Sequence, residues 1–259
     1  VWEIEQNHEH LSEYTFEREH CYFTDTLSRG GKGALTKPDI GLLWSGFRPS
    51  DDACMYGYLI PANMFACVVL GYMAEIAEAV FHDSELAGKA SVLQQIRLSL
   101  EKNAVVHHEK FGTVYAYEID GFGQYNIMDD ANVPSLLSIP FLGYVSAENE
   151  VYQNTRRLIL SDANPYFYKG QAASGIGSPH TPVNHIWPIA LIMQGLTCSE
   201  KAEKKRILEL LLRTDGGTGC MHESFNVDNP HIYTREWFSW ADAFFCTLVL
   251  DYCGLYSAD

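Results

Sequence analysis

The sequence predicts an all-α fold in which antiparallel helical hairpins pack into a toroid, with long loops gathered at one rim. Helical hydrophobic periodicity recurs along the chain, and nearly every unusual polar or aromatic cluster falls on a loop at a helix end. Neither a βαβ rhythm nor a repeat of about 20–50 residues is present. With 259 residues, of which 47% are hydrophobic, the chain can bury a sizeable core. No internal boundary is visible, so we expect one domain over residues 1–259.

The N-terminal half contains two expected helices and one expected hairpin. A flexible glycine-rich loop at 28–33 precedes a long apolar helix over 62–80, which we expect to be buried on most of its circumference. Ser84 is the expected cap of the next helix, in which apolar residues recur at three- and four-residue spacing up to Leu100. The alternation of apolar and polar residues over 114–119 predicts a strand in a hairpin.

In the C-terminal half, helices alternate with long loops. We expect helices at 134–144 and 149–161, one that starts near Trp187 with Pro188 in its first turn, one from a Ser199 cap to Leu212, and a last one over 236–252. The loops at 165–181 and 214–223 are rich in glycine and aromatic residues. These loops carry many of the candidate site residues.

Composition excludes several classes of partner. A net charge of −15 repels phosphate backbones and anionic lipids, so we expect no nucleic acid and no membrane partner. No uninterrupted apolar run approaches about 18 residues, so neither a membrane span nor a signal peptide is expected. The seven cysteines are odd in number and form no CxxC pair, which supports neither a disulfide framework nor a zinc ribbon. Cys67 and Cys246 lie in apolar helical patterns and are expected in the core, and a reducing, cytoplasmic location is favoured.

The stretch from Trp44 to Asp52 combines an aromatic ring, a cation and two adjacent acids. Pro49 is expected to fix a turn, and Ser50 or Asp51 can cap the following helix. A carboxylate at a helix start is most often only a cap. Downstream, however, residues 222–225 and 233–240 again place acids among His, Arg, Tyr and Trp. Aromatic faces stack on pyranose rings and charged groups bind hydroxyls and move protons, so a sugar site and a glycosidase are the first hypothesis.

Asp51 or Asp52 together with Glu223 form the best candidate acid–base pair. Glycoside hydrolysis needs one protonated acid for the leaving oxygen and one carboxylate for the water or the anomeric carbon. Separation in the sequence does not report distance in space, so other acids remain open.

Two alternatives to that pair are visible. Asp129 with Asp130, beside Asn132, can act as an acid pair, bind hydroxyls or cap a helix. Glu236 is a second candidate base, although Arg235 next to it can equally hold it in an ion pair.

No metal or cofactor is expected. His180, His185 and His222 lack the HxxxH or HExxH spacing of a zinc site and are interpreted as hydroxyl-binding or structural. The Ser45–Gly46 and Ser174–Gly175 pairs lack the GxSxG elbow of a hydrolase triad. Two or three of six aromatic residues are expected to face a ligand: Trp44, Tyr166, Tyr168, Trp187, Trp237 and Trp240.

Four long runs carry a family resemblance. They are GLLWSGFRPSDDACMYGYLIPANMFA (41–66), YEIDGFGQYNIMDDANVPSLL (117–137), HIWPIALIMQGLT (185–197) and TDGGTGCMHESFNVDNPHIYTREWFSW (214–240). In these runs the chain resembles the exo-acting α-1,6-mannosidases of glycoside hydrolase family 125. The resemblance implies an (α/α)6 toroid, an α-1,6-mannoside oligosaccharide as the partner, and release of mannose from the non-reducing end with inversion and without a metal.

The resemblance also implies site residues. The general acid falls in the RPSDD run, at Asp52 ahead of Asp51, and the general base in the HESF run is Glu223. Residues in runs expected to shape the sugar subsite are Trp44, Arg48, Asp130, His180, Arg235 and Trp237, and the residues themselves add Asn132, His222 and Glu236 as substrate-binding candidates. Inversion requires acid and base carboxyl groups roughly 6.5–9.5 Å apart and an acid with a raised pKa.

The chain departs from the family pattern at its N-terminal side. Family members are longer and residues 1–50 correspond to their mid-chain, so the chain resembles the C-terminal portion of the family, with a toroid that is incomplete at its N-terminal side. Such a portion is expected to expose apolar helix faces. The stretch 182–185 is also less typical than its surroundings. Two alternatives therefore stay open: another α-glycosidase on the same toroid, and a non-catalytic mannoside-binding fragment.

Overall fold

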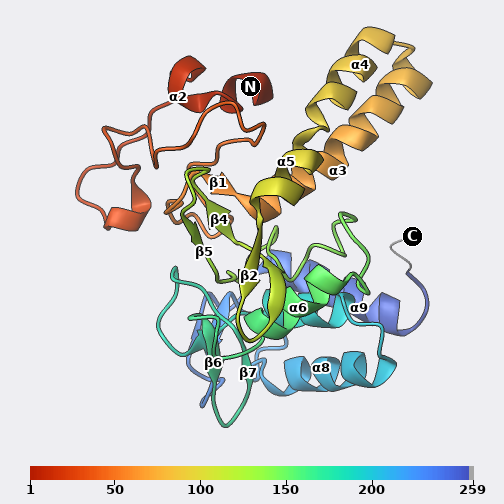
Figure 1. Cartoon of the computed structure of the whole chain (residues 1–259). Coiled ribbons are helices and arrows are strands. Elements are labelled where there is room, and N and C mark those ends of the chain that lie inside the picture. Colours follow the sequence, from red (N-terminus) through yellow and green to blue (C-terminus); the bar gives the residue numbers. More distant parts are fainter. Residues whose placement is uncertain (257–259) are drawn as a thin grey trace. The chain divides into compact units, whose positions relative to one another are not determined.

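The computed structural model describes residues 1–256 and divides into two compact units, coloured along the sequence in Figure 1. Unit 1 comprises residues 1–127 and 142–144, and unit 2 comprises residues 128–141 and those from 145 onward. The expectation of an all-α fold is correct only in part. The described residues are rich in helix, but they also form two three-stranded and two two-stranded sheets.

Unit 1 is built from a helical hairpin and two small antiparallel sheets. Its helices are α1 (Trp2–Glu5), α2 (His8–Leu11), η1 (Phe23–Asp25), α3 (Ile60–Ile76), the π-helical turn η2 (Ala77–Phe81), α4 (Ser84–Leu93) and α5 (Ile96–Asn103). Its strands are β1 (Tyr58–Leu59), β2 (Val105–His108), β3 (Gly112–Tyr115), β4 (Glu118–Ile119) and β5 (Tyr125–Asn126). The strands β2 and β3 form a hairpin, but the single strand expected over 114–119 is divided between β3 and β4. The strand β4 pairs on one side with β1 and on the other with β5.

The long helix α3 packs along one face only. Pro61 lies in its first turn, and Met64, Cys67 and Leu70 are fully buried. In Figure 1, α3 runs beside α4 and α5 as one arm of a hairpin. The other face of α3 and η2, including Ile76 and Val80, is exposed, so the expected burial on most of the circumference is wrong.

The segment Ile60–Phe81 is also apolar and long enough to cross a membrane by length and composition alone. The sequence interpretation did not single out this segment, because Asn63, Glu75 and Glu78 interrupt its apolar run. The finding is weak evidence of a membrane span, since core helices pass the same test.

The capping of α4 differs from the expectation. The carboxylate of Asp83 accepts a hydrogen bond from the amide of Leu86 at 2.9 Å, whereas the hydroxyl of Ser84 donates to Glu78 at 3.1 Å. Ser84 is thus the first helical residue and Asp83 the cap, because the Ser84 side chain is already engaged with the preceding turn. The expected helix up to Leu100 is interrupted after Leu93 and resumes as α5.

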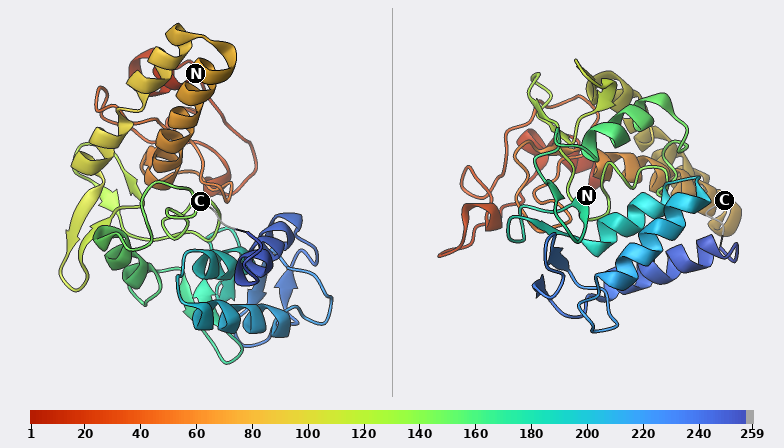
Figure 2. Two further views of the ribbon diagram at one scale, coloured as in Figure 1. Left: turned by 90° about the vertical axis from the view of Figure 1, so that its right-hand side faces the viewer. Right: turned by 90° about the horizontal axis from the view of Figure 1, so that it is seen from below.

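In unit 2, three of the four helices pack against one another, and the strands form one three-stranded and one two-stranded sheet. Its helices are α6 (Glu150–Ile159), α7 (Pro188–Leu196), α8 (Lys201–Arg213) and α9 (Ser239–Tyr252). Its strands are β6 (Phe167–Lys169), β7 (Ser174–Ile176), β8 (His185–Ile186), β9 (Ser224–Asn226) and β10 (Tyr233–Thr234). The apolar α7, with Pro188 in its first turn as expected, packs against both α8 and α9 (Figure 2). The central strand β9 pairs antiparallel with β8 and with β10.

Residues 134–144 were expected to be helical, and the structure places no helix there. Both carboxylate oxygens of Asp129 accept backbone amides of this stretch, from Leu136 at 2.8 Å and Leu137 at 2.9 Å. Within the stretch, the hydroxyl of Ser138 donates to the carbonyl of Ser135 and accepts the amide of Ser135, so it competes with the backbone bonds of a helix. Burial raises the pKa of the Asp129 carboxyl well above its ordinary value, although the two amide bonds act in the opposite direction.

Two smaller expectations are also corrected. The residue that caps α8 is Glu200, without a side-chain hydrogen bond, and not Ser199. Cys67 is buried as expected, but Cys246 is exposed on α9. All seven cysteines are free thiols, and the cytoplasmic location stays a prediction.

Candidate active site

In unit 1, residues 46–54 form a tight hairpin-like loop. Phe47 and Ala53 form an antiparallel bridge, and the amide of Cys54 donates to the carbonyl of Gly46 at 2.9 Å. Within the loop, the amide of Arg48 donates to the carbonyl of Asp52 at 2.8 Å. The carbonyl of Asp52 is therefore held by a main-chain hydrogen bond across the loop.

The two adjacent acids of this loop lie in different surroundings. Asp51 is exposed, and its backbone adopts the left-handed conformation with a φ of +70°, as expected for the tip of a turn. Asp52 is only 3% exposed, and its carboxylate accepts the hydroxyl of Ser50 at 3.0 Å. Asp52 is therefore the buried member of the pair that the sequence left open, and its catalytic role stays a prediction.

A residue that the sequence interpretation missed, Glu118, anchors this loop. Its carboxylate is fully buried on β4 and pairs with the Nε of Arg48 at 2.6 Å. Its second oxygen accepts the amides of Met55 at 3.1 Å and Tyr56 at 3.2 Å and the side-chain amide of Asn126 at 2.9 Å. An acid at an inward position of an alternating strand is the signal that could have identified it.

Arg48 stays charged in this environment. Burial acts to lower its pKa, but the hydrogen bond and charge of Glu118 outweigh burial and raise the pKa above its ordinary value. Arg48 and Glu118 therefore form a buried ion pair that links the loop of Asp52 to the sheet of unit 1.

Trp44 is packed inside unit 1. Its ring stacks on His8 with 3.6 Å between ring centroids and an interplanar angle of 8°. The backbone of Gly57 approaches so closely that a Cβ there would lie 2.7 Å from the Trp44 ring. One ring face of Trp44 is thus occupied by His8, and sugar stacking at this residue stays a prediction.

In unit 2, Glu223 immediately precedes β9. It is 6% exposed, and its carboxylate pairs with the Nε of Arg235 at 3.1 Å, while the Arg235 side chain is 63% exposed. The Glu223 amide lies 3.3 Å from the carbonyls of Thr234 and Arg235. Glu223 is thus a nearly buried carboxylate whose cationic partner extends to solvent, and its role as a base stays a prediction.

His222 lies next to Glu223 and is 1% exposed. Its Nδ1 is 2.7 Å from the carbonyl oxygen of Glu236, and its Nε2 is 2.9 Å from the carbonyl oxygen of Asp215. The ring stacks on Tyr233 with 3.9 Å between centroids. Both ring nitrogens are engaged by backbone, which leaves neither for a sugar hydroxyl.

The remaining candidates in unit 2 fall into an exposed and a buried group. Trp237 is 68% exposed, and Glu236 and His180 are also exposed. Asp130 and Asn132 are buried, and the Nδ2 of Asn132 has no hydrogen-bond partner among the described residues. The alternative acid Asp129 uses both oxygens on backbone amides, so it has a structural role.

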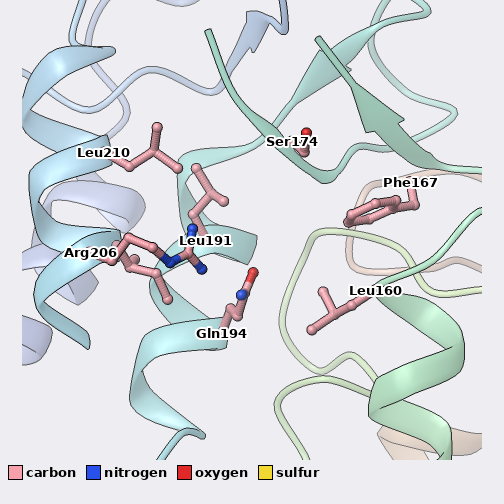
Figure 3. A pocket seen from close by; sticks show the side chains of 8 residues that line it. Leu160, Phe167, Ser174, Leu191, Gln194, Arg206 and Leu210 are labelled. Carbon is pink, nitrogen blue, oxygen red and sulfur yellow. The ribbon is translucent and has the colours of Figure 1, made fainter. Parts of the chain in front are cut away.

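The candidate acids do not line the cavity drawn in Figure 3. This cavity of about 170 Å³ is bounded by α7, α8 and the β6–β7 hairpin. Figure 3 shows the side chain of Arg206 extending from α8 toward Gln194 on α7. Within residues 1–256, no group of three or more His, Cys, Asp or Glu side chains is arranged to hold a metal ion.

Comparison with known proteins now identifies the family. The model of the metal-independent α-mannosidases (GH125) matches residues 1–250, so the chain belongs to this family. A solved structure of a Streptococcus pneumoniae metal-independent α-mannosidase is 52% identical with a TM-score of 0.96. That structure is a non-productive substrate complex with α-1,6-mannobiose.

The relatives are longer than this chain. The Streptococcus pneumoniae structure matches 99% of this chain, which spans 60% of that protein. The meiotically up-regulated gene 157 protein of Schizosaccharomyces pombe is 45% identical over 240 residues, which cover 92% of this chain and 47% of that protein. The chain therefore spans about half the length of the curated relative and three fifths of the solved one.

Proposed function

We propose that the chain forms the catalytic part of an inverting exo-α-1,6-mannosidase that removes mannose from the non-reducing end of α-1,6-linked chains. The observation that carries the proposal is the match over 99% of this chain to a protein whose structure contains α-1,6-mannobiose. The two acids expected to do the chemistry each lie on a firmly hydrogen-bonded loop.

The proposed mechanism uses two acids. Asp52 donates its proton to the glycosidic oxygen as that oxygen leaves, and Glu223 takes a proton from the water that attacks the anomeric carbon. Attack from the face opposite the leaving group gives β-mannose from an α-mannoside. Arg48 and Glu118 hold the loop of the acid, and Arg235 is the charged partner of the base.

Two further residues are proposed to bind the sugar. Trp237 presents a largely exposed indole ring, which can stack on a pyranose face. Asn132 has a buried amide nitrogen without a partner among the described residues, and a sugar hydroxyl can satisfy it.

The stereochemistry of the product tests the mechanism. During hydrolysis of α-1,6-mannobiose followed by proton NMR, we expect β-mannose first and α-mannose only later by mutarotation. The rate is expected to be unchanged in excess chelator. Initial α-mannose would show a retaining mechanism, and loss of activity in chelator would contradict metal independence.

Substitution of the adjacent acids tests the choice between them. Asp52→Asn is expected to lower kcat on mannobiose by about 10²-fold, because the leaving oxygen loses its proton donor. Asp51→Asn is the matched control, since Asn tolerates the left-handed backbone of position 51 and keeps the turn. A larger loss in Asp51→Asn than in Asp52→Asn would reverse the assignment.

The second candidate is a non-catalytic mannoside-binding function, which is favoured by the 60% and 47% coverage of the relatives. It predicts binding of α-1,6-mannobiose in calorimetry with no product. Turnover of a different disaccharide would instead favour another α-glycosidase specificity.

A further inference from the structure

The contacts of Glu223 itself hold the proposed base only loosely. Its carboxylate pairs with Arg235 at 3.1 Å, but the Arg235 side chain is 63% exposed and can follow a movement of the acid. The amide of Glu223 lies 3.3 Å from each of two carbonyls, those of Thr234 and Arg235. This distance is beyond the usual range of an N–H···O hydrogen bond, so both contacts are weak. A firmer anchor lies two residues earlier in the chain.

Met221 is held at both of its backbone groups by the start of α9. Its amide donates to the Oδ1 of Asp242 at 2.8 Å, and its carbonyl accepts the amide of Phe238 at 2.9 Å. Phe238 immediately precedes α9, and Asp242 lies in the first turn of that helix. Met221 is also 5% exposed, so the two bonds are made inside the protein. The segment that leads to Glu223 is thus clamped to one turn of helix, once by main chain and once by a side chain.

The side chain of Asp242 is directed to this one contact. A hydrogen bond from an amide to a carboxylate is stronger than one to a neutral acceptor, and a carboxylate in the first turn of a helix also interacts favourably with the helix dipole. Its other oxygen, Oδ2, is buried and has no hydrogen-bond partner among residues 1–256. Within the described chain, the amide of Met221 is therefore the hydrogen-bond partner of the Asp242 carboxylate. A substitution of Asp242 consequently tests that bond.

We propose that Asp242 is a positioning residue for the base: by accepting the amide of Met221, it fixes the backbone that presents the Glu223 carboxylate to the attacking water. The proposal rests on the proposed function, in which Glu223 is the base. When the acceptor is removed, the buried Met221 amide loses its partner, and the segment shifts to regain one. A shift of about 1 Å at a reacting group is enough to cost about 10²-fold in rate.

Kinetics of variants at position 242 test the positioning role. Asp242→Ala is expected to lower kcat on α-1,6-mannobiose by about 10²-fold, with KM changed much less, because a displaced base fails in the chemical step. Asp242→Asn is expected to restore most of the kcat, because its amide oxygen can accept the same hydrogen bond from Met221.

Asp251→Ala is the matched control. Asp251 lies in the last turn of the same helix, and its carboxylate accepts the Nζ of Lys204 on α8 at 2.5 Å. The control thus removes a carboxylate of α9 that does not touch the segment of Glu223, and its kcat is expected to stay at the wild-type value.

Two kinetic outcomes would overturn the proposal. An unchanged kcat in Asp242→Ala beside a fully active wild type would show that the clamp does not position the base. A loss in Asp242→Asn as large as that in Asp242→Ala would show that the negative charge matters and the hydrogen bond does not. Should Asp242→Ala fail to fold, the shorter side chain of Asp242→Ser is expected to give the same fall in kcat, and a wild-type kcat in that variant would again contradict the positioning role.

Hydrogen exchange separates a failure of this proposal from a failure of the proposed function, because it needs no turnover. An inactive wild type would contradict the proposed function, and exchange would then decide whether Asp242 holds the segment. Faster exchange of the Met221 and Glu223–Phe225 amides in Asp242→Ala than in Asp251→Ala would support the clamp. Equal exchange in the two variants would overturn it.

Discussion

Glu223→Gln is expected to lower kcat on α-1,6-mannobiose by about 10⁴-fold, the upper end of what a general base contributes. Glutamine matches the shape of glutamate and its amide oxygen can still accept from the Nε of Arg235, which lies 3.1 Å from the carboxylate. The fold should therefore persist while the ability to take a proton from water is lost. The measurement is release of mannose by a folded variant, with the midpoint of unfolding compared with wild type.

Glu236, the other candidate base, provides the control for that experiment. Glu236→Gln changes an exposed carboxylate thirteen residues further along the chain, which the sequence left open as a second base. Its kcat is expected to stay much closer to that of wild type. If Glu236→Gln loses the activity and Glu223→Gln keeps it, Glu236 is the base and the proposed mechanism is wrong.

Several helices could be predicted from local signals. Residues 149–161 contain α6 because Asn149 accepts the amide of Tyr152 at 3.0 Å as an N-cap, and α7 begins at a proline. The prediction of a helix over residues 134–144 failed because hydroxyl groups within the stretch compete for its backbone. The hydroxyl of Ser138 donates to the carbonyl of Ser135 and accepts the amide of Ser135, and hydrophobic periodicity does not report such a competitor.

In the candidate site, too, local sequence predicts some features, whereas others depend on contacts between distant residues. The runs around Asp52 and Glu223 point to acids among aromatic and cationic residues, which is enough to select candidates. Which of Asp51 and Asp52 is buried depends on contacts at a distance, such as the amide of Ala53 on the carbonyl of Thr24 at 2.7 Å. Glu118 was missed because its partner Arg48 lies 70 residues away and only the fold brings them together.

The largest loss of stability is expected in Glu118→Leu. The substitution leaves the Arg48 guanidinium buried without its carboxylate, and it also removes the acceptor of the Met55, Tyr56 and Asn126 donors. Breaking one side of a buried ion pair costs about 3–5 kcal/mol in the free energy of unfolding, and the unsatisfied amides add to that cost. Urea or thermal unfolding of the variant measures the loss.

Two companion variants make the reason for that loss testable. Arg48→Met removes the cation but leaves Glu118 with its three N–H donors, so a smaller loss is expected than in Glu118→Leu. Glu85→Gln breaks an exposed pair with Lys89, and no measurable change is expected, because water and ions already screen that pair. Equal losses in Glu118→Leu and Arg48→Met would show that the ion pair alone stabilises the loop. A larger loss in Glu118→Leu would show that Glu118 organises the loop of Asp52 through the backbone amides as well as through Arg48.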